Sequence, residues 1–313
     1  MTEDKNVKKS LLMKKTGQAL TFLTGEMLGC YEGERLPTFS QFADKSGFSR
    51  GTLQSALAFL EQMGAVSLNK RGHMGTFLEA KNTTLLLEYG ALQYIAGIMP
   101  LPYTIVYEGL ATGIYNASRT HYKLPVNLAY MRGSERRIQN VLDRRYDFAI
   151  TSRLAANAAI EKGYPIEIIK DFGASSYLSG HSIVFHDERE SVIRPGMKIG
   201  VDRISLDHVR LSKLAVGDCK VEFVDLNYSQ IMKLILDGRI DAAVWNIDNV
   251  LERYTAVNHV PFSGGESLGE DIAVMLVAKD NKAVSVILDE CIDIADVLEQ
   301  QQKVIRGEIY PNY

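Results

Sequence analysis

Several features that would place this chain in a familiar class are scarce or missing from its 313 residues. Three cysteines are present, Cys30, Cys219 and Cys291, and they show neither paired nor metal-ligand spacing, as expected for reduced thiols in the cytoplasm. No segment is long and apolar enough to span a bilayer. The net charge of -3 argues against a wholly basic protein of the histone type.

Sequence signatures of catalysis are also missing. The six histidines have no metal-ligand spacing, no nucleophile elbow appears, and no glycine-rich phosphate loop follows a strand. We therefore expect no metal and no cofactor, and the sequence predicts a protein that is not an enzyme.

With 313 residues the chain is long enough for two or three compact units, and its 46% of hydrophobic residues is enough to give each unit a core. Its charge is uneven: residues 1–80 hold ten Lys or Arg and eight Asp or Glu, a balance of +2, which leaves -5 for the rest. Apolar residues between Val7 and Met27 predict a first helix rather than a lipoprotein signal, since polar residues interrupt the run. Nearby lysines could add phosphate contacts or belong to a frayed, solvated terminus: Lys5, Lys8, Lys9, Lys14 and Lys15.

Residues 38–63 have the pattern of two helices joined by a turn. Thr38 and Gln41 have capping-box spacing at the start of a helix that should end at Gly47. Ser49 then caps a second helix, whose apolar stripe is Leu53, Ala56, Leu57, Leu60 and Met63. An ordinary amphipathic core helix would show the same periodicity, so the segment that follows decides between the two interpretations.

That segment is a basic, glycine-marked hairpin, in which Val66–Leu68 and Thr76–Leu78 predict strands on either side of Lys70–Gly75. The order of parts favours a winged helix-turn-helix. A second helix placed in the major groove would reach base edges with the polar side chains of its first turns. The hairpin tip would contact phosphates or the adjacent minor groove.

These segments resemble the winged helix of the GntR family over about residues 15–80. The resemblance rests on four elements: Arg35-Leu-Pro37, the Ser49–Leu53 turn, the Ala56–Gly64 run and Gly75-Thr-Phe77. It implies a phosphate contact by Arg35, recognition-helix contacts by Arg50 and Thr52, and wing positions for Gly72 and Gly75. Thr38–Gln41 departs from the family's usual Ser-Glu-Arg-Glu, and Gln54 stands where arginine is common, so the operator sequence is not carried over. The residues predicted to contact DNA are Arg35, Ser49, Arg50, Thr52, Gln54, Lys70, Arg71, Gly72 and His73.

Residues 84–99 predict a linker helix closed off by Pro100 and Pro102, which would pack on the next domain or contribute to a dimer interface. Beyond Pro102 strands and helices alternate, as in parallel α/β proteins. The predicted strands are Tyr103–Glu108, Val126–Met131, Tyr146–Ser152, Ile166–Ile169, Ser182–Phe185, Lys198–Asp202, Lys220–Val224, Ile240–Trp245 and Ile272–Val277. The predicted helices include Gly133–Arg145, Ser205–Val216, Tyr228–Leu236 and a long closing helix, Ala283–Ile305.

Asn140–Ser152 and Lys233–Asn246 repeat one order of parts: helix, turn, Asp, strand, then polar residues. This repeat resembles the two lobes of a type II periplasmic-binding-protein fold over residues 100–310, and the whole chain resembles the YhfZ-like group of bacterial regulators. The predicted fold is multidomain, with a small, mainly α winged helix-turn-helix followed by an α/β two-lobed domain. The predicted bounds are 1–80 for the first domain, 81–102 for the linker helix and 103–313 for the second, with lobe 1 at about 103–185 plus 272–313 and lobe 2 at about 197–262.

In open α/β sheets, ligands collect at the carboxyl ends of strands and at helix amino termini, whose free N–H groups and positive dipole favour anions. The predicted cleft residues are Glu108, Gly109, Gly133, Ser134, Thr151, Ser152, Arg153, Ser175, Ser176, Asp202, Ser205, Trp245 and Asn246. Each could instead be an ordinary cap or turn residue. Trp245 is either a core residue beside the hinge or a stacking surface for a ligand.

The sequence thus favours a cytoplasmic transcription regulator that binds a double-stranded DNA operator as a homodimer and responds to a small-molecule effector, which could be anionic. Two alternatives use the same two-lobed fold. A secreted solute-binding protein is disfavoured by the amino-terminal segment. An enzyme would need groups such as Glu108 and Asp202 to approach each other across the cleft.

Overall fold

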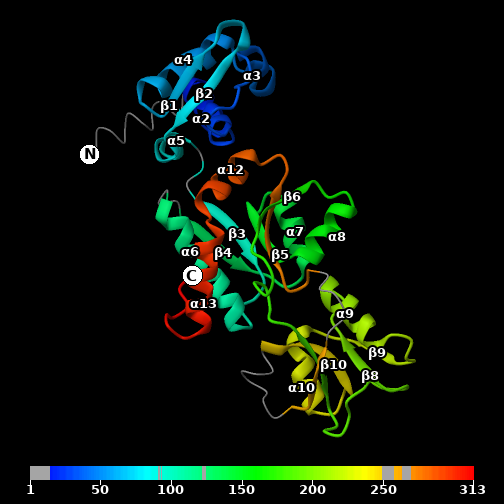
Figure 1. Ribbon diagram of the computed structural model, residues 1–313. Coiled ribbons are helices and arrows are strands. Elements are labelled where there is room, and N and C mark those ends of the chain that lie inside the picture. The colour runs from blue at the N-terminus through cyan, green and yellow to red at the C-terminus, as the bar shows by residue number, and fades with distance from the viewer. Residues whose placement is uncertain (1–14, 91, 93, 122–124, 249–256, 263–268) are drawn as a thin grey trace. The chain divides into compact units, whose positions relative to one another are not determined.

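The computed structural model describes residues 15–90, 92, 94–121, 125–248, 257–262 and 269–313 (Figure 1). The chain divides into two compact units. The first comprises Met1–Ile95, Ser118–Val126 and Lys279–Cys291, and the second comprises Ala96–Ala117, Asn127–Ala278 and Ile292–Tyr313. The lysines predicted at positions 5, 8, 9 and 14, and the start of the predicted first helix, lie outside the described residues.

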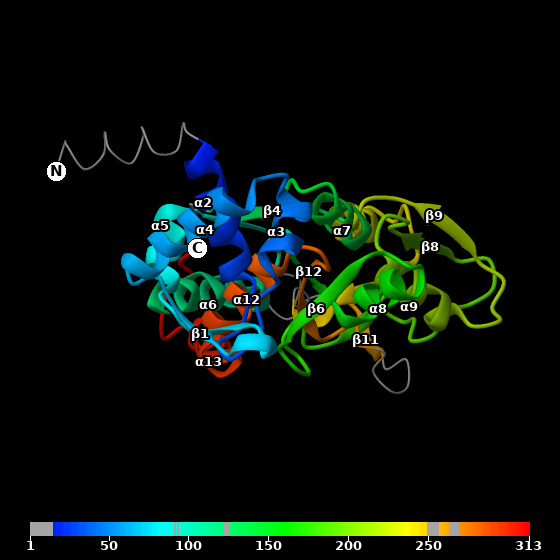
Figure 2. The ribbon, with the colours of Figure 1, turned by 90° about the horizontal axis from the view of Figure 1, so that it is seen from above.

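Helices α2, α3 and α4 form the core of the first unit, with α3 and α4 beside α2 (Figures 1 and 2). Their bounds are Lys15–Leu28, Phe39–Ser46 and Arg50–Gln62. Leu23 and Met27 of α2 and Leu53 and Leu60 of α4 have no exposed surface, because the apolar stripes of both helices face each other. Met63, predicted as the last residue of the α4 stripe, follows the helix and is 43% exposed.

The predicted helix caps are confirmed. Thr38 Oγ1 accepts a hydrogen bond from the Gln41 N–H at 3.3 Å, and Gln41 Oε1 accepts one from the Thr38 N–H at 2.8 Å. Gly47 ends α3 in the left-handed region, with φ 74°. Ser49 Oγ accepts from the Thr52 N–H at 3.2 Å and so caps α4, which begins at the next residue, Arg50.

A hairpin and two further helices complete the first unit. The hairpin consists of antiparallel β1 (Val66–Lys70) and β2 (Thr76–Lys81), with the short 3-10 helix η1 (Gly72–Met74) at its tip. Helices α5 (Thr83–Tyr89) and α12 (Lys282–Cys291) both pack against α2. An ion pair of 2.8 Å between Lys81 and Glu290 joins the hairpin to α12, and the Lys81 side chain is only 3% exposed.

The sheet of lobe 1, in the second unit, has the strand order β4-β3-β5-β12-β6. β3 runs parallel to β5, whereas β12 is antiparallel to both β5 and β6. The strand bounds are β3 Ile95–Met99, β4 Val126–Tyr130, β5 Phe148–Ser152, β6 Ile166–Asp171 and β12 Ala273–Ala278. The helices of this lobe are α6 Ile105–His121, α7 Ser134–Leu142, α8 Arg153–Glu161 and α13 Ile294–Ile305.

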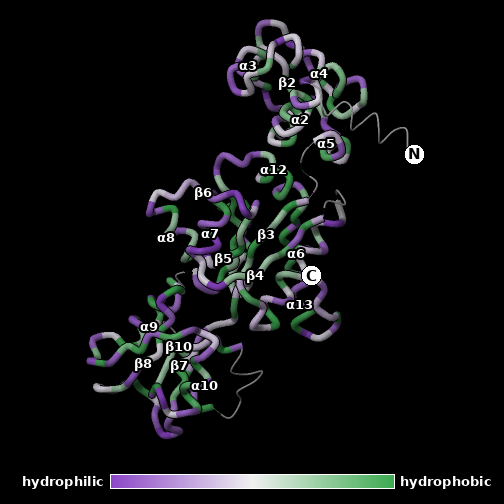
Figure 3. Tube along the Cα trace, turned by 180° about the vertical axis from the view of Figure 1, so that it is seen from behind, coloured by the Kyte–Doolittle hydropathy of each residue, from purple (hydrophilic) through white to green (hydrophobic). Residues whose placement is uncertain are grey.

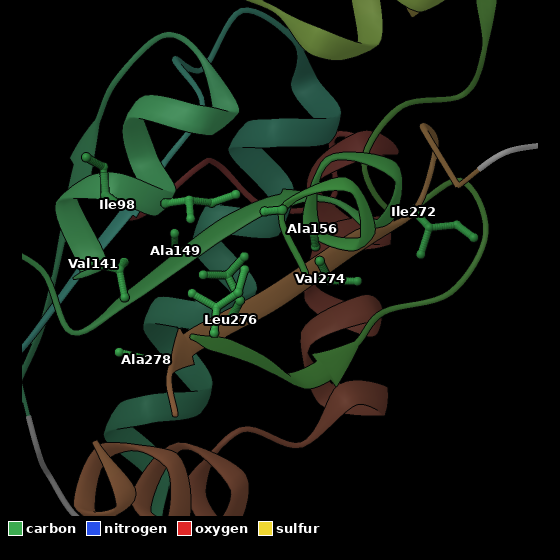
Figure 4. Close-up of a cluster of buried hydrophobic side chains, with 11 residues drawn as sticks. Ile98, Val141, Ala149, Ala156, Ile272, Val274, Leu276 and Ala278 are labelled. Atoms are coloured by element: carbon green, nitrogen blue, oxygen red, sulfur yellow. The ribbon is translucent and has the colours of Figure 1, made fainter. Parts of the chain in front are cut away.

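The core of lobe 1 lies between the sheet and helices α7 and α8. Figure 4 shows members of this buried cluster, which come from β3 (Ile98), β5 (Ala149), β12 (Val274, Leu276 and Ala278), α7 (Val141) and α8 (Ala156). Strands of this sheet are among the hydrophobic segments of the trace (Figure 3). Strands β5 and β12 are buried along their whole length, as expected for inner strands of a sheet that helices cover on both faces.

Lobe 2 repeats this arrangement, with the strand order β11-β7-β10-β8-β9. β8, β9 and β10 run parallel, and β7 is antiparallel to β10 and β11. The bounds are β7 His181–Phe185, β8 Lys198–Val201, α9 Leu206–Val216, β9 Glu222–Asp225, η2 Tyr228–Gln230, α10 Ile231–Leu236, β10 Ala242–Asn246 and β11 His259–Phe262. The prediction of a helix-turn-helix region followed by a two-lobed α/β domain is confirmed.

Three predicted elements are wrong. The linker helix over residues 84–99 is replaced by the short α5 and by strand β3, and Gly97 of that strand lies against the Phe148 ring, where a Cβ would not fit. Tyr103–Glu108 is not a strand, because α6 begins at Ile105. The closing helix is broken into α12 and α13, since Asp293 caps a new helix by accepting from the Asp296 N–H at 3.0 Å.

Candidate functional sites

The amino end of α4 is open to solvent. Arg50 and Gln54 are exposed, and Thr52 is partly buried with its hydroxyl 2.8 Å from that of Ser49. The predicted contact residues in this helix therefore divide into two kinds. Ser49 and Thr52 order the first turn, whereas the side chains of Arg50 and Gln54 are accessible to a partner.

The wing carries exposed basic side chains at Lys70, Arg71 and His73. The Arg71 guanidinium lies 4.5 Å from the ring centroid of Phe77, which holds it by a cation–π contact. Lys70 pairs with Glu61 of α4 at 3.4 Å, and both groups are substantially exposed. Gly72, also predicted, is exposed and adopts φ 55° at the tip.

Arg35 lies along the wing. Its backbone forms a bridge with Phe77, and a Cβ at Gly75 would lie 2.7 Å from Arg35 Nε. Gly75 also has φ 97°, a conformation that a side chain disfavours. A glycine at this position therefore leaves room for the Arg35 side chain, which ties the predicted phosphate contact to the shape of the hairpin.

The second unit contains a cleft of about 110 Å³ between residues of the two lobes, whereas a single water needs only about 10–15 Å³. Room therefore exists for a small organic molecule. The lining residues are Pro100, Leu101, Tyr103, Thr104, Tyr107, Met131, Arg132, Gly133, Ser134, Arg137, Tyr177, Leu178, His181, Asp202, Ser205, Asp207, His208, Tyr228 and Asn246.

Part of the predicted ligand set lines this cleft: Gly133, Ser134, Asp202, Ser205 and Asn246. The others do not belong to the lining: Glu108, Gly109, Thr151, Ser152, Arg153, Ser175, Ser176 and Trp245. Glu108 and Gly109 were expected at a strand end, but they lie in α6, where Gly109 packs against Gln301 of α13. Their predicted position is therefore wrong.

The remaining predicted residues outside the lining have structural partners. Arg153 forms an ion pair with Asp171. The Ser175 N–H donates to Asp271 Oδ2 at 3.0 Å, and Ser176 Oγ accepts from the Ala273 N–H at 2.9 Å. Thr151 lies behind the lining, 3.5 Å from a terminal nitrogen of Arg137.

An ion pair joins the lobes at the cleft. Arg132, which follows β4 of lobe 1, donates to Asp202 Oδ2 at 2.6 Å and to Asn227 Oδ1 at 2.6 Å, both in lobe 2. Asp202 is 3% exposed and also accepts from the N–H groups of Ile204 and Tyr228. Its carboxylate is thus fully engaged.

A second link between the lobes involves Asp207 in the first turn of α9. Its Oδ2 accepts from Ser152 Oγ of lobe 1 at 2.6 Å. The residue as a whole is only half-buried, but Oδ1 is shielded from solvent and has no hydrogen-bond partner among the residues described. Burial raises the pKa of Asp207 to about 6, although the Ser152 hydrogen bond and the nearby Arg137 charge oppose the shift.

The two lining histidines are both held neutral. His208 Nδ1 accepts from the Asp202 N–H at 2.9 Å, so Nε2 carries the proton and donates to the Val244 carbonyl at 2.9 Å. Burial lowers the pKa of His208, and it lowers the pKa of His181 to about 4. Neither imidazole supplies positive charge to the cleft near neutral pH.

Trp245 lies behind the cleft wall. Its ring stacks on Tyr228 at a centroid distance of 4.1 Å and an interplanar angle of 14°, and it belongs to the hydrophobic core of lobe 2 with 5% exposure. Tyr228 in turn lines the cleft, and its hydroxyl accepts from the Asn246 N–H at 2.9 Å. Of the two interpretations left open by the sequence, the geometry matches the core residue.

Helix amino termini also reach the cleft. Helix α7 begins after Gly133, which has φ 83°, and no side chain of the described residues caps it. Thr104 Oγ1 accepts from the Tyr107 N–H at 3.3 Å at the start of α6, and Ser205 caps α9. The uncapped N–H groups of α7 and the Arg132 guanidinium are therefore the groups best suited to an anion.

No group of three or more His, Cys, Asp or Glu that could hold a metal occurs within the described ranges. None of the helices in the described part of the chain is long and apolar enough to cross a membrane.

Sequence reasoning missed the cleft residues Arg132, Arg137, Asp207 and His208. A signal was present for two of them, because Asp207 and His208 stand two and three residues after the predicted cap Ser205 and therefore lie in the first helical turn. The four cleft tyrosines gave no such signal, since they come from separate segments: Tyr103, Tyr107, Tyr177 and Tyr228.

Comparison with known proteins connects these sites to a family. A model described as the YhfZ C-terminal domain matches residues 82–313, and a helix-turn-helix domain model matches residues 31–78. The uncharacterized protein YhfZ of Escherichia coli (strain K12) is 30% identical over 311 residues, covering 96% of this chain and 98% of its own.

Solved structures agree with this assignment. The crystal structure of YhfZ from Shigella flexneri matches with 30% identity and a TM-score of 0.60, covering 74% of this chain and 97% of that one. The periplasmic aliphatic sulphonate binding protein SsuA from Escherichia coli matches at 12% identity with a TM-score of 0.51, covering 69% of this chain and 74% of that one, a likeness of fold alone. Because the carboxyl-terminal domain model spans most of the chain and a relative aligns over nearly all of it, the protein belongs to the YhfZ family.

Proposed function

We propose that the protein is a transcription regulator that binds double-stranded operator DNA as a homodimer and responds to a small-molecule effector in the cleft. The observation that carries this proposal is the exposed amino end of α4, with Arg50 and Gln54 accessible beside a basic wing, in a chain that also has a ligand-sized cleft. A DNA-binding role would place the protein in the cytoplasm.

The basic side chains support DNA binding by their distribution. Arg50 and Gln54 can reach base edges, since the first turns of a recognition helix enter the major groove. Lys70, Arg71 and His73 on the wing suit phosphates or the minor groove, and Arg35 lies against the same hairpin. These features support a winged helix of the GntR type, and two such modules in a homodimer would read half-sites about 34 Å apart.

The chain's path supports a response to ligand. It runs from β12, which pairs with β5 and β6 in the lobe 1 sheet, into α12, which packs against α2, and then into α13. An effector that changes the position of the lobes would therefore act on the helix that supports the helix-turn-helix. Such a response requires different effector affinities in the two states, a coupling of typically about 1–3 kcal/mol.

The test is a mobility-shift titration of the full-length protein at two salt concentrations, on DNA fragments that have first been selected for binding to it. We expect affinity to fall steeply with salt, because Lys and Arg release counterions from the phosphates. Thermal-shift screening against metabolites would identify the effector, since a ligand at about a hundredfold its dissociation constant stabilises by about 2.7 kcal/mol. Undetectable or salt-independent DNA binding would contradict the proposal.

A further inference from the structure

The cleft lining contains a buried positive charge that is bonded to no carboxylate. Arg137 is 3% exposed, and its hydrogen-bond partners among the described residues are all uncharged: the carbonyls of Ile150 and Met131, at 3.0 and 2.8 Å, and the hydroxyls of Tyr177 and Thr151, at 3.1 and 3.5 Å. A buried charge without a bonded opposite charge is costly. An anion in the cleft would lower that cost without touching the guanidinium, because charges act over several ångströms where water is excluded.

An accessible donor without a partner stands at the start of α7. Ser134 lines the cleft and is 8% exposed. Its hydroxyl has no hydrogen-bond partner within the described ranges, yet its oxygen is not among the solvent-shielded atoms that lack one, so a molecule in the cleft can reach it. A nearly buried hydroxyl without a partner needs a specific explanation, and a bound ligand supplies one.

Gly133 keeps the first turn of α7 free of a protein cap. The residue has φ 83°, a conformation that side chains disfavour, and a Cβ there would lie 2.7 Å from Ile204 Cγ2. A glycine in the N-cap position has no side chain to accept from the N–H groups of the first turn, and no other side chain of the described residues does so. These N–H groups and the positive end of the helix dipole are therefore left for an anion.

Arg132 brings further donors to the same lining. A guanidinium has five N–H groups, and Arg132 uses one for Asp202 and one for Asn227. The others have no acceptor among the described residues, and the side chain is 27% exposed. The Ser134 hydroxyl, the first N–H groups of α7 and the free N–H groups of Arg132 thus form a set of donors that lacks an acceptor.

The cleft has no matching place for a positive charge. Its described lining contains two carboxylates, those of Asp202 and Asp207. Asp202 already accepts from the Arg132 guanidinium and from two backbone N–H groups. Asp207 accepts from Ser152 through Oδ2, and its Oδ1 is shielded from solvent, so a ligand cannot reach it. A protonated amine in the cleft would lose its water without gaining a negatively charged acceptor.

The rest of the lining suits an uncharged body. Burial lowers the pKa of His181 to about 4, so this lining imidazole is neutral. The cleft volume of about 110 Å³ is on the scale of the cavity of about 150 Å³ that holds a benzene ring. The body of the ligand is therefore about the size of one ring. It would lie among four aromatic side chains: Tyr103, Tyr107, Tyr177 and Tyr228.

We propose that Ser134, the free N–H groups of α7 and Arg132 bind the acidic group of a compact organic acid whose remaining part carries no charge. The proposal rests on the effector-binding role proposed above and adds the chemical class of the effector. Carboxylates, sulfonates and phosphates share the chemistry that these donors recognise, so the test includes each of them.

The test compares acids with matched amides and with matched zwitterions, using the full-length protein. The carboxylates are propanoate, with propanamide and alanine, and phenylacetate, with phenylacetamide and phenylglycine. Ethanesulfonate is paired with taurine, and ethyl phosphate with phosphoethanolamine. Thermal shift finds the binding probes, and calorimetric titration measures their dissociation constants. Fluorescence of Trp245, the sole tryptophan, gives a second readout, because its ring stacks on the cleft residue Tyr228.

We expect an acid to bind and its uncharged amide to bind about a hundredfold more weakly, because the amide loses the charge that the donors recognise. The matched zwitterion should bind about tenfold more weakly than the acid, since its ammonium group is desolvated without an acceptor of opposite charge. This comparison needs no variant.

Ser134→Asp separates binding from folding. An acidic side chain in the first turn interacts favourably with the helix dipole, so the melting temperature should be kept, whereas acid binding should weaken at least about a hundredfold because two negative charges would share the site. Ser191→Asp, at an exposed serine between β7 and β8, is the matched control and should leave binding unchanged. Ser134→Ala should weaken the acid about tenfold through the lost hydrogen bond, and it serves if Ser134→Asp does not fold.

Equal affinity for an acid and its amide, tighter binding of a zwitterion than of its acid, unchanged acid binding by the folded Ser134 variants, or no binding by any acid in the panel would overturn the proposal. These results are separate from DNA binding. A protein that shifts DNA but prefers zwitterions or amides contradicts only the assignment of the acid, whereas acid binding at Ser134 without any DNA binding contradicts only the regulator.

Discussion

Arg132 and Asp202 form an ion pair of 2.6 Å that joins the two lobes at the edge of the cleft. The Asp202 side chain is 5% exposed, and the Arg132 side chain is 27% exposed. Each therefore depends on the other more than an ordinary surface pair would, because little water is available to replace the lost partner.

Arg132→Ala should lower the free energy of unfolding by about 2 kcal/mol, because it leaves a buried carboxylate without its charged donor. Arg203→Ala is the matched control, since Arg203 and Asp225 are 3.8 Å apart with exposed side chains, and it should cost about 0.5 kcal/mol or less. Urea denaturation measures both. Equal losses in the two variants would show that the interlobe pair has no special role.

The stability of the effector-free protein should depend on the protonation of Asp207. Its pKa rises from 3.8 to about 6 on folding, so the folded state binds the proton more tightly. Stability from this group is present below about pH 4 and is lost as the pH rises to about 6. His181 has the opposite effect on stability. Its pKa falls from 6.5 to about 4 on folding, so the folded protein loses stability as the pH drops from about 6.5 to about 4.

Asp207→Asn separates these two contributions. The stability of the variant relative to the wild type should increase by about 2 kcal/mol between pH 4 and pH 6.5 and then stay level, because this window covers most of the titration of a group whose pKa is shifted by about two units. Chemical denaturation across this pH range provides the measurement. A difference that does not vary with pH would mean that Asp207 titrates normally in the folded protein.

Gly75→Ala should damage the wing. The added Cβ would lie 2.7 Å from Arg35 Nε at a residue with φ 97°, which should cost about 1–2 kcal/mol and also weaken DNA binding by displacing Arg35. Gly25→Ala in α2 is the control, because no atom lies within 4 Å of its Cβ position. It should stabilise by up to about 1 kcal/mol. Thermal unfolding of both variants tests the prediction, and a neutral Gly75→Ala would contradict the close packing of Arg35.

Arg50→Ala and Lys70→Ala should weaken DNA binding in different ways. Loss of a base contact by Arg50 should cost about 1–3 kcal/mol and relax specificity at one position. Loss of a phosphate contact by Lys70 should weaken binding to all sequences alike and reduce the salt dependence. Titrations on specific and random DNA distinguish the two, with Lys213→Ala in lobe 2 as a control. Indistinguishable effects of Arg50→Ala and Lys70→Ala would contradict the assigned contacts.

The helix-turn-helix was predictable because its signals are local. Thr38, Gln41, Gly47 and Ser49 set the helix ends through hydrogen bonds and a left-handed turn within a few residues. The strands of the two lobes were predictable for a related reason, since the runs of apolar residues are short and bounded by polar turns.

The errors arose where tertiary packing decides the structure. Ile95–Met99 is a short apolar run that fits a helix or a strand equally, and the contact of Gly97 with the Phe148 ring selects the strand. The β-branched residues before Glu108 suggested a strand, yet Gly109 and Gly113 pack closely on Gln301 and Val297 of α13, which requires a helix. The cleft shows the same limit. Helix caps were predictable, but Arg137 acquires its partners only when α7 packs against β5, and Asp207 meets Ser152 only when the two lobes come together.

The most direct test of the regulator is selection of bound fragments from random DNA by the full-length protein, followed by sequencing. The account predicts enrichment of a short symmetric site whose half-sites are about one helical turn apart, and Arg50→Ala should blur that site. Failure to enrich any sequence, or an enriched site that Arg50→Ala leaves unchanged, would contradict it.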